Sequence, residues 1–578
     1  MTRQHPSGSG GSGIGRPARR IWLAAVMAAE LMMAGCASLP TSGMVHEGLE
    51  DSGAEVPFIQ ALAAPPAPDA SLRQIAEGFL QAMLAGASDD FQVARSYLTE
   101  EAAAVWDPLA SVTVYQSGEA PVLTEPGTQL GRVDLSVTRV GQVDSTGRYR
   151  AEASATTTQT LGMAQNEDSQ WRISSLPDGI VIPEDVFRVD YVPTPIYFPS
   201  TDGQFLVPDL RVFSRQAAAT AAVKQFLDGP PQYLYGAVGA VVPSGTRLTT
   251  NAVGVADGVA TVNLSAAMSR ASESARATVW SCLQATLTTL PNVHAVEFQI
   301  ESAPMAVQAG GSLTANPRAR PGPFFLGDGG IWRLVDAEPE LLANTEAAAT
   351  WETLTVDHTE KRMAGLQDGA VQVLGGLQTD TTVLELPDGA PVTAPPAFDT
   401  SGWLWVASGD TVWAFDADAA AHSLGATWLA GREVVALAPS RDGSRLAVAV
   451  EGTAAGSVEI ALTGIVRGQG TGPWRLTGPI WVGQFYTPFS SLSWSDGMTL
   501  AFLAPSEPGA SPVPVEFIIG GDATYLKLPT DPPASLASGS GLGEVFAAGT
   551  NGGLFRYSVR GRIWSALAGG ARAVTLAP

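Results

Sequence analysis

The cysteine at position 36 is the residue of this sequence best placed for chemistry. It directly follows Gly35 and comes after an apolar run over residues 21–29, which three arginines precede. A positive segment, a short apolar segment and a small-residue cleavage site together make a secretory signal peptide. The run is too short for a membrane-spanning helix, which needs roughly 20 apolar residues, and Glu30 interrupts it. We therefore expect residues 1–35 to be a signal peptide.

The motif Met33-Ala34-Gly35-Cys36 resembles the lipobox of bacterial lipoprotein signals. The resemblance implies signal cleavage between Gly35 and Cys36, S-diacylglycerol on the Cys36 thiol and an acyl group on the new amino terminus. Two or more acyl chains anchor a protein stably to a membrane, whereas a single chain is marginal. An ordinary secreted protein with an unrelated cysteine, or an uncleaved anchor helix, is the alternative. General secretory export and twin-arginine export both fit Arg19-Arg20.

The charge balance limits the partners of this chain. Its 578 residues carry 56 acidic and 33 basic side chains, and only three of the basic ones are lysines. The formal net charge is −23, and loss of residues 1–35 makes it about −26. Nucleic-acid binding depends on Lys and Arg that neutralise phosphates, so we expect no nucleic-acid partner. No polybasic stretch assists membrane binding, so the lipid would anchor the chain alone.

No constellation of residues predicts catalysis, a cofactor or a metal. The sequence has no Gly-Lys-Ser/Thr phosphate-binding loop and no His-Glu-x-x-His zinc motif. Four histidines follow residue 36, and none has a partner at metal-ligand spacing. Once Cys36 is acylated, Cys282 has no cysteine to pair with. Because Cys282 lies on the apolar face of an expected helix, we predict that it is a small buried hydrophobic side chain.

The length allows three or four domains, and shifts in composition divide the chain. Several prolines mark residues 36–68 as an extended tether. The sequence of residues 69–195 predicts an α+β domain. Ser71 and Gln74 have capping-box spacing at the start of a first helix, a second helix follows, and alternating valine and leucine then indicate strands. This order resembles a cystatin-like or SnoaL-type cone, which we end at a run of prolines near residue 195.

The sequence of residues 205–305 predicts a second α+β domain. A helix over residues 216–227 ends at Asp228-Gly229-Pro230, which is a stop signal. Asp257-Gly258 lies between two valines and indicates a hairpin, and a second helix is expected over residues 272–290. The stretches FLDGPP, VPSGTRL, VADGVATVNLS and LQATLTTLPNVHAVEF resemble the GerMN domain of the sporulation protein GerM and of actinobacterial lipoproteins. Members of that family are extracytoplasmic modules without assigned catalytic residues.

Residues 320–578 contain a repeat. LAPSRDGSRLA, from Leu437, recurs as LSWSDGMTLA from Leu492, and the turn of the repeat falls at positions 360, 402, 443, 497 and 543. The resulting intervals of 42, 41, 54 and 46 residues match β-propeller blades, which run about 40–50 residues. The final VTLAP copies the first strand of a blade, and the hairpin that it lacks begins at Phe324. We expect an all-β propeller of about six blades, one built from both ends of the array, with seven as the alternative.

The order of lipobox, α+β domain, GerMN-like domain and terminal propeller resembles the LpqB family of actinobacterial lipoproteins. The resemblance implies a lipoprotein anchored at the extracytoplasmic face of the cell membrane. It also implies a partner, the extracellular part of a sensor histidine kinase such as MtrB of the MtrA–MtrB two-component system. The lipoprotein would modulate the kinase and so affect cell-wall growth and division. No catalytic residue is expected, so we predict that the chain is not an enzyme.

Two other classes of function stay open, because a fold does not fix a function. A cell-wall saccharide or peptidoglycan receptor, or an enzyme, would use the propeller channel or the cone of the first domain. Paired carboxylates converging on the propeller axis would favour that class. Exposed aromatic residues on a polar face would favour docking of a protein partner instead. A purely structural envelope protein would have no effect on a kinase.

Overall fold

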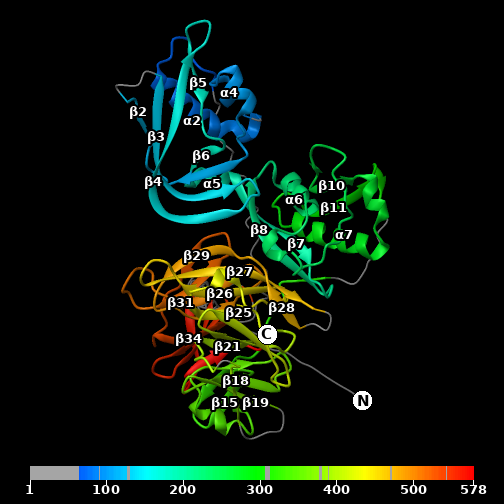
Figure 1. Ribbon diagram of the computed structural model, residues 1–578, viewed down its shortest axis with the longest axis vertical. Coiled ribbons are helices and arrows are strands. Elements are labelled where there is room, and N and C mark those ends of the chain that lie inside the picture. Colours follow the sequence, from blue (N-terminus) through cyan, green and yellow to red (C-terminus); the bar gives the residue numbers. More distant parts are fainter. Residues whose placement is uncertain are drawn as a thin grey trace, which may run out of the picture. The chain divides into compact units, whose positions relative to one another are not determined.

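Three domains follow one another along the chain in the computed structural model (Figure 1). The structure describes residues 64–578, except for residues 90, 127–130, 306–312, 376–380, 388, 469–471, 540 and 542. The predicted order of two α+β domains and an all-β domain is confirmed. The predicted signal peptide, the cleavage and lipidation sites at Gly35 and Cys36, and most of the predicted tether lie outside the described residues.

The first domain is a six-stranded sheet with helices packed against it. Its elements are α2 (Leu72–Asp89), α3 (Gln92–Ser96), α4 (Glu100–Val105), β1 (Ser111–Tyr115), β2 (Val122–Thr124), β3 (Arg132–Asp144), β4 (Tyr149–Gln165), β5 (Trp171–Ser175), β6 (Ile180–Pro183) and α5 (Glu184–Asp190). The strand order is β5-β4-β3-β1-β6, and β2 pairs with β3. The predicted capping box is confirmed, because the Ser71 amide donates to Gln74 Oε1 at 2.9 Å and the Gln74 amide donates to Ser71 Oγ at 3.4 Å.

Two details of the first domain differ from the prediction. The sequence indicated two helices ahead of an antiparallel sheet, but α4 is a third helix ahead of the sheet and α5 follows the last strand. Thr99 caps α4 by accepting from the Ala102 amide. Helices of six or seven residues hold fewer than two turns, so they leave no apolar period in the sequence. In addition, β6 pairs with β1 in the parallel direction, at the edge of the sheet.

The second domain contains two sheets and two longer helices. Its elements are β7 (Tyr191–Pro199), β8 (Phe205–Ser214), α6 (Ala218–Leu227), η1 (Gln232–Leu234), β9 (Gly254–Ala256), β10 (Val259–Leu264), η2 (Ala266–Arg270), α7 (Glu273–Leu287), β11 (Ala295–Ile300), β12 (Ala303–Pro304) and β13 (Thr314–Ala315). The strand orders are β12-β11-β10-β9 and β13-β8-β7. The predicted hairpin is confirmed, because Asp257 and Gly258 have left-handed φ angles of 49° and 72° between the paired strands β9 and β10.

The proline run near residue 195 is a strand and does not end a domain. Strand β7 contains Pro193, Pro195 and Pro199, and it pairs with β8 over nine residues. Proline lacks an N–H group and is therefore tolerated in an edge strand, where that group would point away from the ladder. Tyr197 occupies the same alternating set of positions, and its amide points outward to Thr286 Oγ1 at 3.0 Å. The prolines thus occupy the positions of β7 that need no partner on β8.

The third domain consists of six antiparallel sheets. Its strands, in the order of these sheets, are β14 (Phe324–Gly327), β15 (Gly330–Val335), β16 (Glu338–Leu341) and β38 (Ala573–Thr575); β17 (Thr355–Val356), β18 (Arg362–Gln367), β19 (Ala370–Gly375) and β20 (Thr382–Leu384); β21 (Ala394–Phe398), β22 (Leu404–Ser408), β23 (Thr411–Phe415) and β24 (Ala421–Ser423); β25 (Val434–Pro439), β26 (Arg445–Glu451), β27 (Ser457–Arg467), β28 (Pro473–Leu476) and β29 (Ile480–Tyr486); β30 (Ser490–Trp494), β31 (Thr499–Ala504), β32 (Val513–Ile518) and β33 (Ala523–Tyr525); and β34 (Pro533–Ser538), β35 (Val545–Gly549), β36 (Leu554–Ser558) and β37 (Ile563–Ala568). Two short 3-10 helices, η3 (Glu346–Thr350) and η4 (Thr427–Leu429), lie in its connections.

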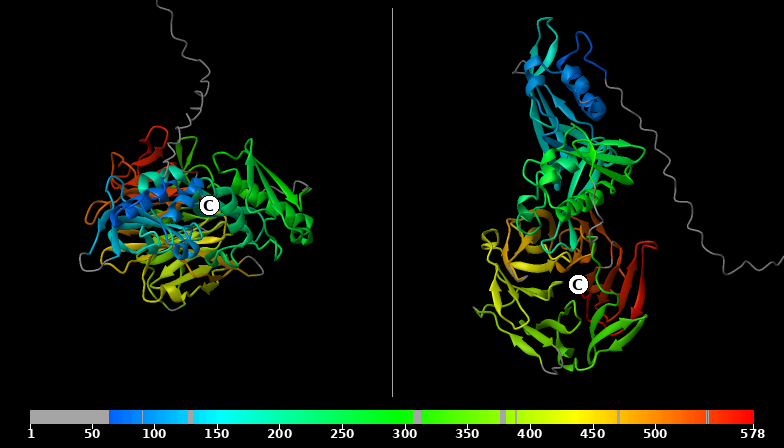
Figure 2. Two further views of the ribbon diagram at one scale, coloured as in Figure 1. Left: turned by 90° about the horizontal axis from the view of Figure 1, so that it is seen from above. Right: turned by 90° about the vertical axis from the view of Figure 1, so that its right-hand side faces the viewer.

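One blade is built from both ends of the propeller, as predicted. The last strand, β38, pairs with β14, and Val574 lies opposite Phe325 in that pair. In Figure 2 the end of the chain accordingly lies among the propeller sheets. Pairing the first and last strands covers edges that would otherwise be open to other chains. The described residues form six such sheets, so this part of the chain has six blades and not seven.

The repeated turn of the blades is structural. Four of its five predicted positions, Glu360, Gly402, Gly443 and Gly543, have left-handed φ angles between 60° and 82°. Asp399 precedes the second of these turns, and its Oδ1 accepts from two backbone amides at 2.8 and 2.9 Å. An aspartate that binds its own turn in this way fixes the turn conformation. The aspartates of these turns therefore shape hairpins.

Candidate functional site

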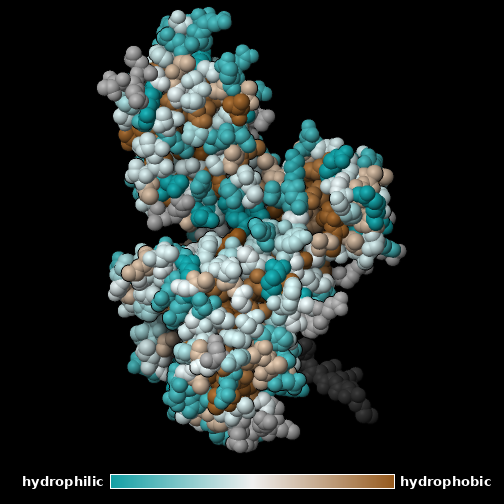
Figure 3. Space-filling model, in the orientation of Figure 1, coloured by the Kyte–Doolittle hydropathy of each residue, from teal (hydrophilic) through white to brown (hydrophobic). Residues whose placement is uncertain are grey.

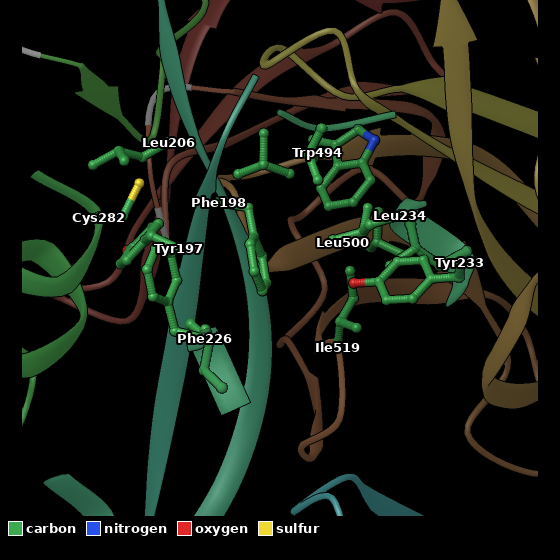
Figure 4. Close-up of a cluster of buried hydrophobic side chains, with 14 of the residues drawn as sticks. Tyr197, Phe198, Leu206, Phe226, Tyr233, Leu234, Cys282, Trp494, Leu500 and Ile519 are labelled. Atoms are coloured by element: carbon green, nitrogen blue, oxygen red, sulfur yellow. The ribbon is translucent and has the colours of Figure 1, made fainter. Parts of the chain in front are cut away.

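Strands β7 and β8 are the part of the second domain that packs against the propeller. A strand covered on one face alternates between buried and exposed residues, but β8 is buried in two consecutive runs. One continuous apolar cluster explains this. It contains Phe198 and Leu206 of the second domain together with Trp494, Leu500 and Ile519 of the propeller (Figure 4). The two domains therefore share one hydrophobic core.

Arg445 crosses the boundary between these two domains. Its side chain is 1% exposed, and its guanidinium pairs with Asp442 at 2.5 Å. The same group donates to the carbonyl of Pro208, in β8, at 3.2 Å, and it lies 4.7 Å from the ring centre of Trp494. A buried charge is tolerated only where it is paired and hydrogen-bonded. Both Nη atoms of Arg445 have such partners, whereas its Nε has none among the described residues. Arg445 thus joins the fourth blade to β8.

A second connection between the propeller and the second domain is made by an inserted hairpin of the fourth blade, which consists of the end of β27 and of β28. Strand β28 is a fifth strand in a blade whose neighbours have four, and it accounts for the long interval of 54 residues in the repeat. Thr477, just after β28, donates from Oγ1 to the carbonyl of Tyr233 at 2.5 Å. A Cβ atom on Gly464 would lie 2.5 Å from that carbonyl oxygen, so only glycine fits at this position without a shift.

Asp209 lies at the centre of a buried polar cluster beside β8. The carboxylate is 2% exposed and accepts from Arg211 Nε at 2.6 Å, from Tyr233 Oη at 3.0 Å and from Arg148 Nη2 at 3.5 Å. Burial, followed by the negative charge of Asp209, raises the pKa of Tyr233. The phenol therefore stays protonated and acts as a donor to the carboxylate.

The first domain joins the same cluster through the turn between β3 and β4. Arg211 Nη1 donates to the carbonyl of Thr146 at 2.6 Å, and the amide of Val212 donates to the carbonyl of Gly147 at 2.7 Å. Arg148 follows in the same turn and contributes the long contact to Asp209. Strand β8 is thus hydrogen-bonded both to the turn of the first domain and to the fourth blade of the propeller.

A cavity of about 370 Å³ lies at the propeller axis, and the inner strands of all six blades line it. Its lining is mostly alanine, serine, threonine and proline, with Glu352 as the one acidic side chain among the described lining residues. Arg441 crosses its end and donates to the carbonyls of Trp494 at 2.6 Å and Ser538 at 2.9 Å, which belong to two further blades. Burial lowers the pKa of Arg441 to about 10. The described lining therefore lacks the paired carboxylates that would favour a hydrolytic enzyme.

Two aromatic side chains are exposed at the seam between the second domain and the inserted hairpin. Trp474 in β28 is 70% exposed, and Tyr235, just after η1, is 69% exposed. Their chain segments are neighbours, because a Cβ atom on Gly236 would lie 3.7 Å from Arg475 Nη2. Apolar residues of the second domain also reach the surface on the face that Figure 3 shows. Trp474 was not predicted from the sequence, although the long repeat interval indicated the insertion that carries it.

The remaining predicted residues have structural surroundings. Cys282 in α7 is fully buried and unpaired, and burial raises the pKa of its thiol, so the prediction of a buried hydrophobic side chain is confirmed. His422 packs edge-on against Trp403 with 5.0 Å between the ring centres. Within the part of the chain that the structure describes, no three His, Cys, Asp or Glu side chains form a possible metal site.

Three family models match the three domains. The model of the lipoprotein LpqB N-terminal domain matches residues 65–188, a sporulation and spore germination model matches residues 195–306, and the model of the lipoprotein LpqB beta-propeller domain matches residues 329–576. The chain belongs to the LpqB lipoprotein family. The middle match begins in β7, in agreement with the place of that strand in the second domain.

Lipoprotein LpqB of Cutibacterium acnes is 36% identical over 53% of this chain, and this match spans 49% of the length of that relative. Lipoprotein LpqB of Thermobifida fusca is 28% identical over 83% of this chain and 86% of its own length. A solved structure of the first GerMN domain of GerM from Bacillus subtilis is 16% identical, covers 21% of this chain and 97% of that chain, and has a TM-score of 0.17.

Membership of the LpqB family implies a lipoprotein anchored to a membrane. The LpqB relatives carry names of lipoproteins and not of enzymes. Among the residues that the structure describes, no helix is long and apolar enough to cross a bilayer.

Proposed function

We propose that this LpqB lipoprotein is held by lipid on Cys36 at the extracytoplasmic face of the membrane and docks on a sensor histidine kinase. The kinase is of the MtrB type, and docking modulates its signalling and so cell-wall growth and division. The lipoprotein acts as a binding protein without catalytic activity. Family membership supports the proposal, because the LpqB resemblance is what implies the kinase partner.

The observation that carries the docking proposal is the exposure of Trp474 and Tyr235, whose chain segments approach each other at Arg475 and Gly236. Tryptophan, tyrosine and arginine are the residues that most often dominate protein–protein binding energies. The hydrogen bond from Thr477 to the Tyr233 carbonyl and the close approach of Gly464 to that carbonyl join the two segments, so the backbone beneath these aromatic residues is held in place. A pre-organised surface loses less conformational entropy when it binds. The cavity at the propeller axis, by contrast, has Glu352 as the one acidic side chain of its described lining and so offers no pair of acidic side chains for hydrolysis.

A pull-down tests this function. The bait is the tagged full chain in detergent extracts of its own membranes, and captured proteins are identified by mass. We expect a sensor histidine kinase in the wild-type sample and its loss with Trp474→Ala and Tyr235→Ala. Tyr525→Ala is the matched control, because Tyr525 is also exposed, at 42%, but lies at the end of β33.

Two results would contradict the proposal. One is the absence of any sensor kinase, especially if the chain sediments with purified peptidoglycan, which would favour the alternative of a cell-wall receptor. The other is capture of the kinase by the Trp474→Ala and Tyr235→Ala variants at the wild-type level, because docking would then use another surface.

A further inference from the structure

A second cavity, of about 370 Å³, opens within the second domain. Residues 226–230 and 239–246 line it together with Phe198. These two segments overlap the stretches FLDGPP and VPSGTRL, which the docking proposal does not use. Sites for small ligands have volumes of about 300–1,000 Å³, so this cavity has room for one or two amino-acid residues.

The floor of this cavity is apolar and buried. The rings of Phe198 and Phe226 stack with 5.6 Å between their centres and 22° between their planes. Both side chains belong to the shared core and are 3% and 1% exposed. Leu227, Val241 and Val242 add aliphatic lining. An apolar side chain is the group that gains most from such a floor.

One wall of the cavity offers an unpaired backbone. Val238 forms an antiparallel bridge with Ser200, and the amide of Gly239 donates to the carbonyl of Pro199 at 2.8 Å. The ladder stops there, and in the described structure residues 240–242 make no backbone hydrogen bond. A row of free N–H and C=O groups beside a side-chain pocket is what an extended peptide needs to add as a strand.

The charge of the rim selects the sign of the ligand. Asp228 is the one charged residue that lines the cavity. It follows the last turn of α6, where the carbonyls of the helix carry partial negative charge. Near the other lining segment, the guanidinium of Arg270 donates to the carbonyl of Ser244 at 2.5 Å, but Arg270 does not itself line the cavity. Lys224 also lies in that last turn but is not a lining residue, so a cationic group of the ligand is favoured beside Asp228.

We propose that this cavity binds an extended segment of another protein. The segment pairs its backbone with residues 240–242, inserts an apolar side chain over Phe198 and Phe226, and places a lysine or arginine beside Asp228. The site lies entirely in the second domain. Neither Tyr235 nor Trp474 is among its described lining residues, and its ligand does not depend on the identity of the kinase.

A displayed library of random hexapeptides, panned against the full chain in phosphatidylcholine nanodiscs, tests the proposal. We expect enrichment of peptides with an apolar central residue and a neighbouring lysine or arginine. Ala240→Trp fills the mouth of the cavity from an exposed position and should reduce binding of an enriched peptide at least tenfold. Ala421→Trp, at an exposed position of β24, is the matched control and should change nothing.

Two further measurements separate the parts of the site. Asp228→Asn should weaken the basic peptides about threefold to tenfold and remove their preference over peptides with glutamate at that position. N-methylation of the central backbone amides should abolish binding, because it blocks strand pairing. The proposal is overturned if the library shows no enrichment over the Ala240→Trp chain, if acidic peptides are enriched, or if N-methylated peptides bind as well as unmodified ones. Unchanged circular dichroism of each variant establishes that it is folded.

Discussion

Arg445 joins the fourth blade to the second domain through an ion pair, a hydrogen bond and a ring contact. Removing one partner of a buried pair leaves the other charge uncompensated and costs about 3–5 kcal/mol. We predict that Arg445→Met lowers the free energy of unfolding by that amount, because Asp442 is only 4% exposed. The double variant Arg445→Met/Asp442→Asn should recover most of the loss. Urea unfolding followed by tryptophan fluorescence measures both.

An exposed ion pair provides the control for Arg445. Arg73 and Glu77 in α2 are 2.8 Å apart with side chains 57% and 47% exposed. Such pairs contribute about 0–1 kcal/mol, so Arg73→Met should have little effect. Equal losses in Arg445→Met and Arg73→Met would show that the buried pair does not hold the boundary.

Glu516 gives the stability a defined dependence on pH. Burial raises the pKa of its carboxyl above the ordinary value of 4.5, although Ser495 and the amide of Gly543 donate to it. The folded state therefore binds this proton more tightly than the unfolded state, and its contribution is present below pH 4.5 and lost as the pH rises through the folded pKa. We predict that Glu516→Gln removes this loss. Thermal unfolding of both chains from pH 4 to pH 8 should show the difference widening with pH, and parallel curves would contradict it.

At the scale of single residues, the sequence predicted what depends on local spacing. The capping box of Ser71 and Gln74 and the burial of Cys282 follow from positions along one helix. The cluster around Asp209 could not be predicted, because Arg148 and Tyr233 reach it from other parts of the chain. Their meeting depends on how domains pack, which no local pattern records.

At the scale of elements, the inserted hairpin of the fourth blade is the feature that the seam depends on. We predict that Gly464→Ala destabilises the chain by about 1–3 kcal/mol, the usual cost of overpacking, since the new Cβ would meet the carbonyl of Tyr233 and the Cβ of Ala237. Gly468→Ala, in the same hairpin, is the matched control, because no atom lies within 4 Å of its added Cβ. Hydrogen exchange of the β8 amides should accelerate in the first variant and not in the second.

The strand β7 and the insertion show why element boundaries were harder to predict. Three prolines within seven residues indicate a linker, and only the edge position of β7 makes them compatible with a strand. The interval of 54 residues did indicate extra chain in the fourth blade, but the pairing of β28 with the last three residues of the long strand β27 needed the structure. The order of the blades, and the blade that is built from both ends of the propeller, were predictable because each repeat copies the same strand and turn.

At the scale of the whole molecule, the shared core predicts shared unfolding. Residues of the second domain and the propeller form one apolar cluster, whereas the first domain has a core of its own. We therefore predict that calorimetry resolves no separate transition for the second domain. Hydrogen exchange at intermediate urea should show α7 and β26 losing protection together. Loss of α7 protection ahead of β26 would contradict a common core.

The central claim is that this LpqB lipoprotein docks on a sensor kinase through the exposed aromatic pair at the seam. The most direct measurement is the dissociation constant between the full chain in nanodiscs and the purified extracytoplasmic domain of the kinase. We predict saturable binding that Trp474→Ala weakens by about 30-fold, which corresponds to a dominant contact of roughly 2 kcal/mol, and that Tyr525→Ala leaves unchanged. The absence of saturable binding, or equal constants for the wild type and Trp474→Ala, would contradict this account.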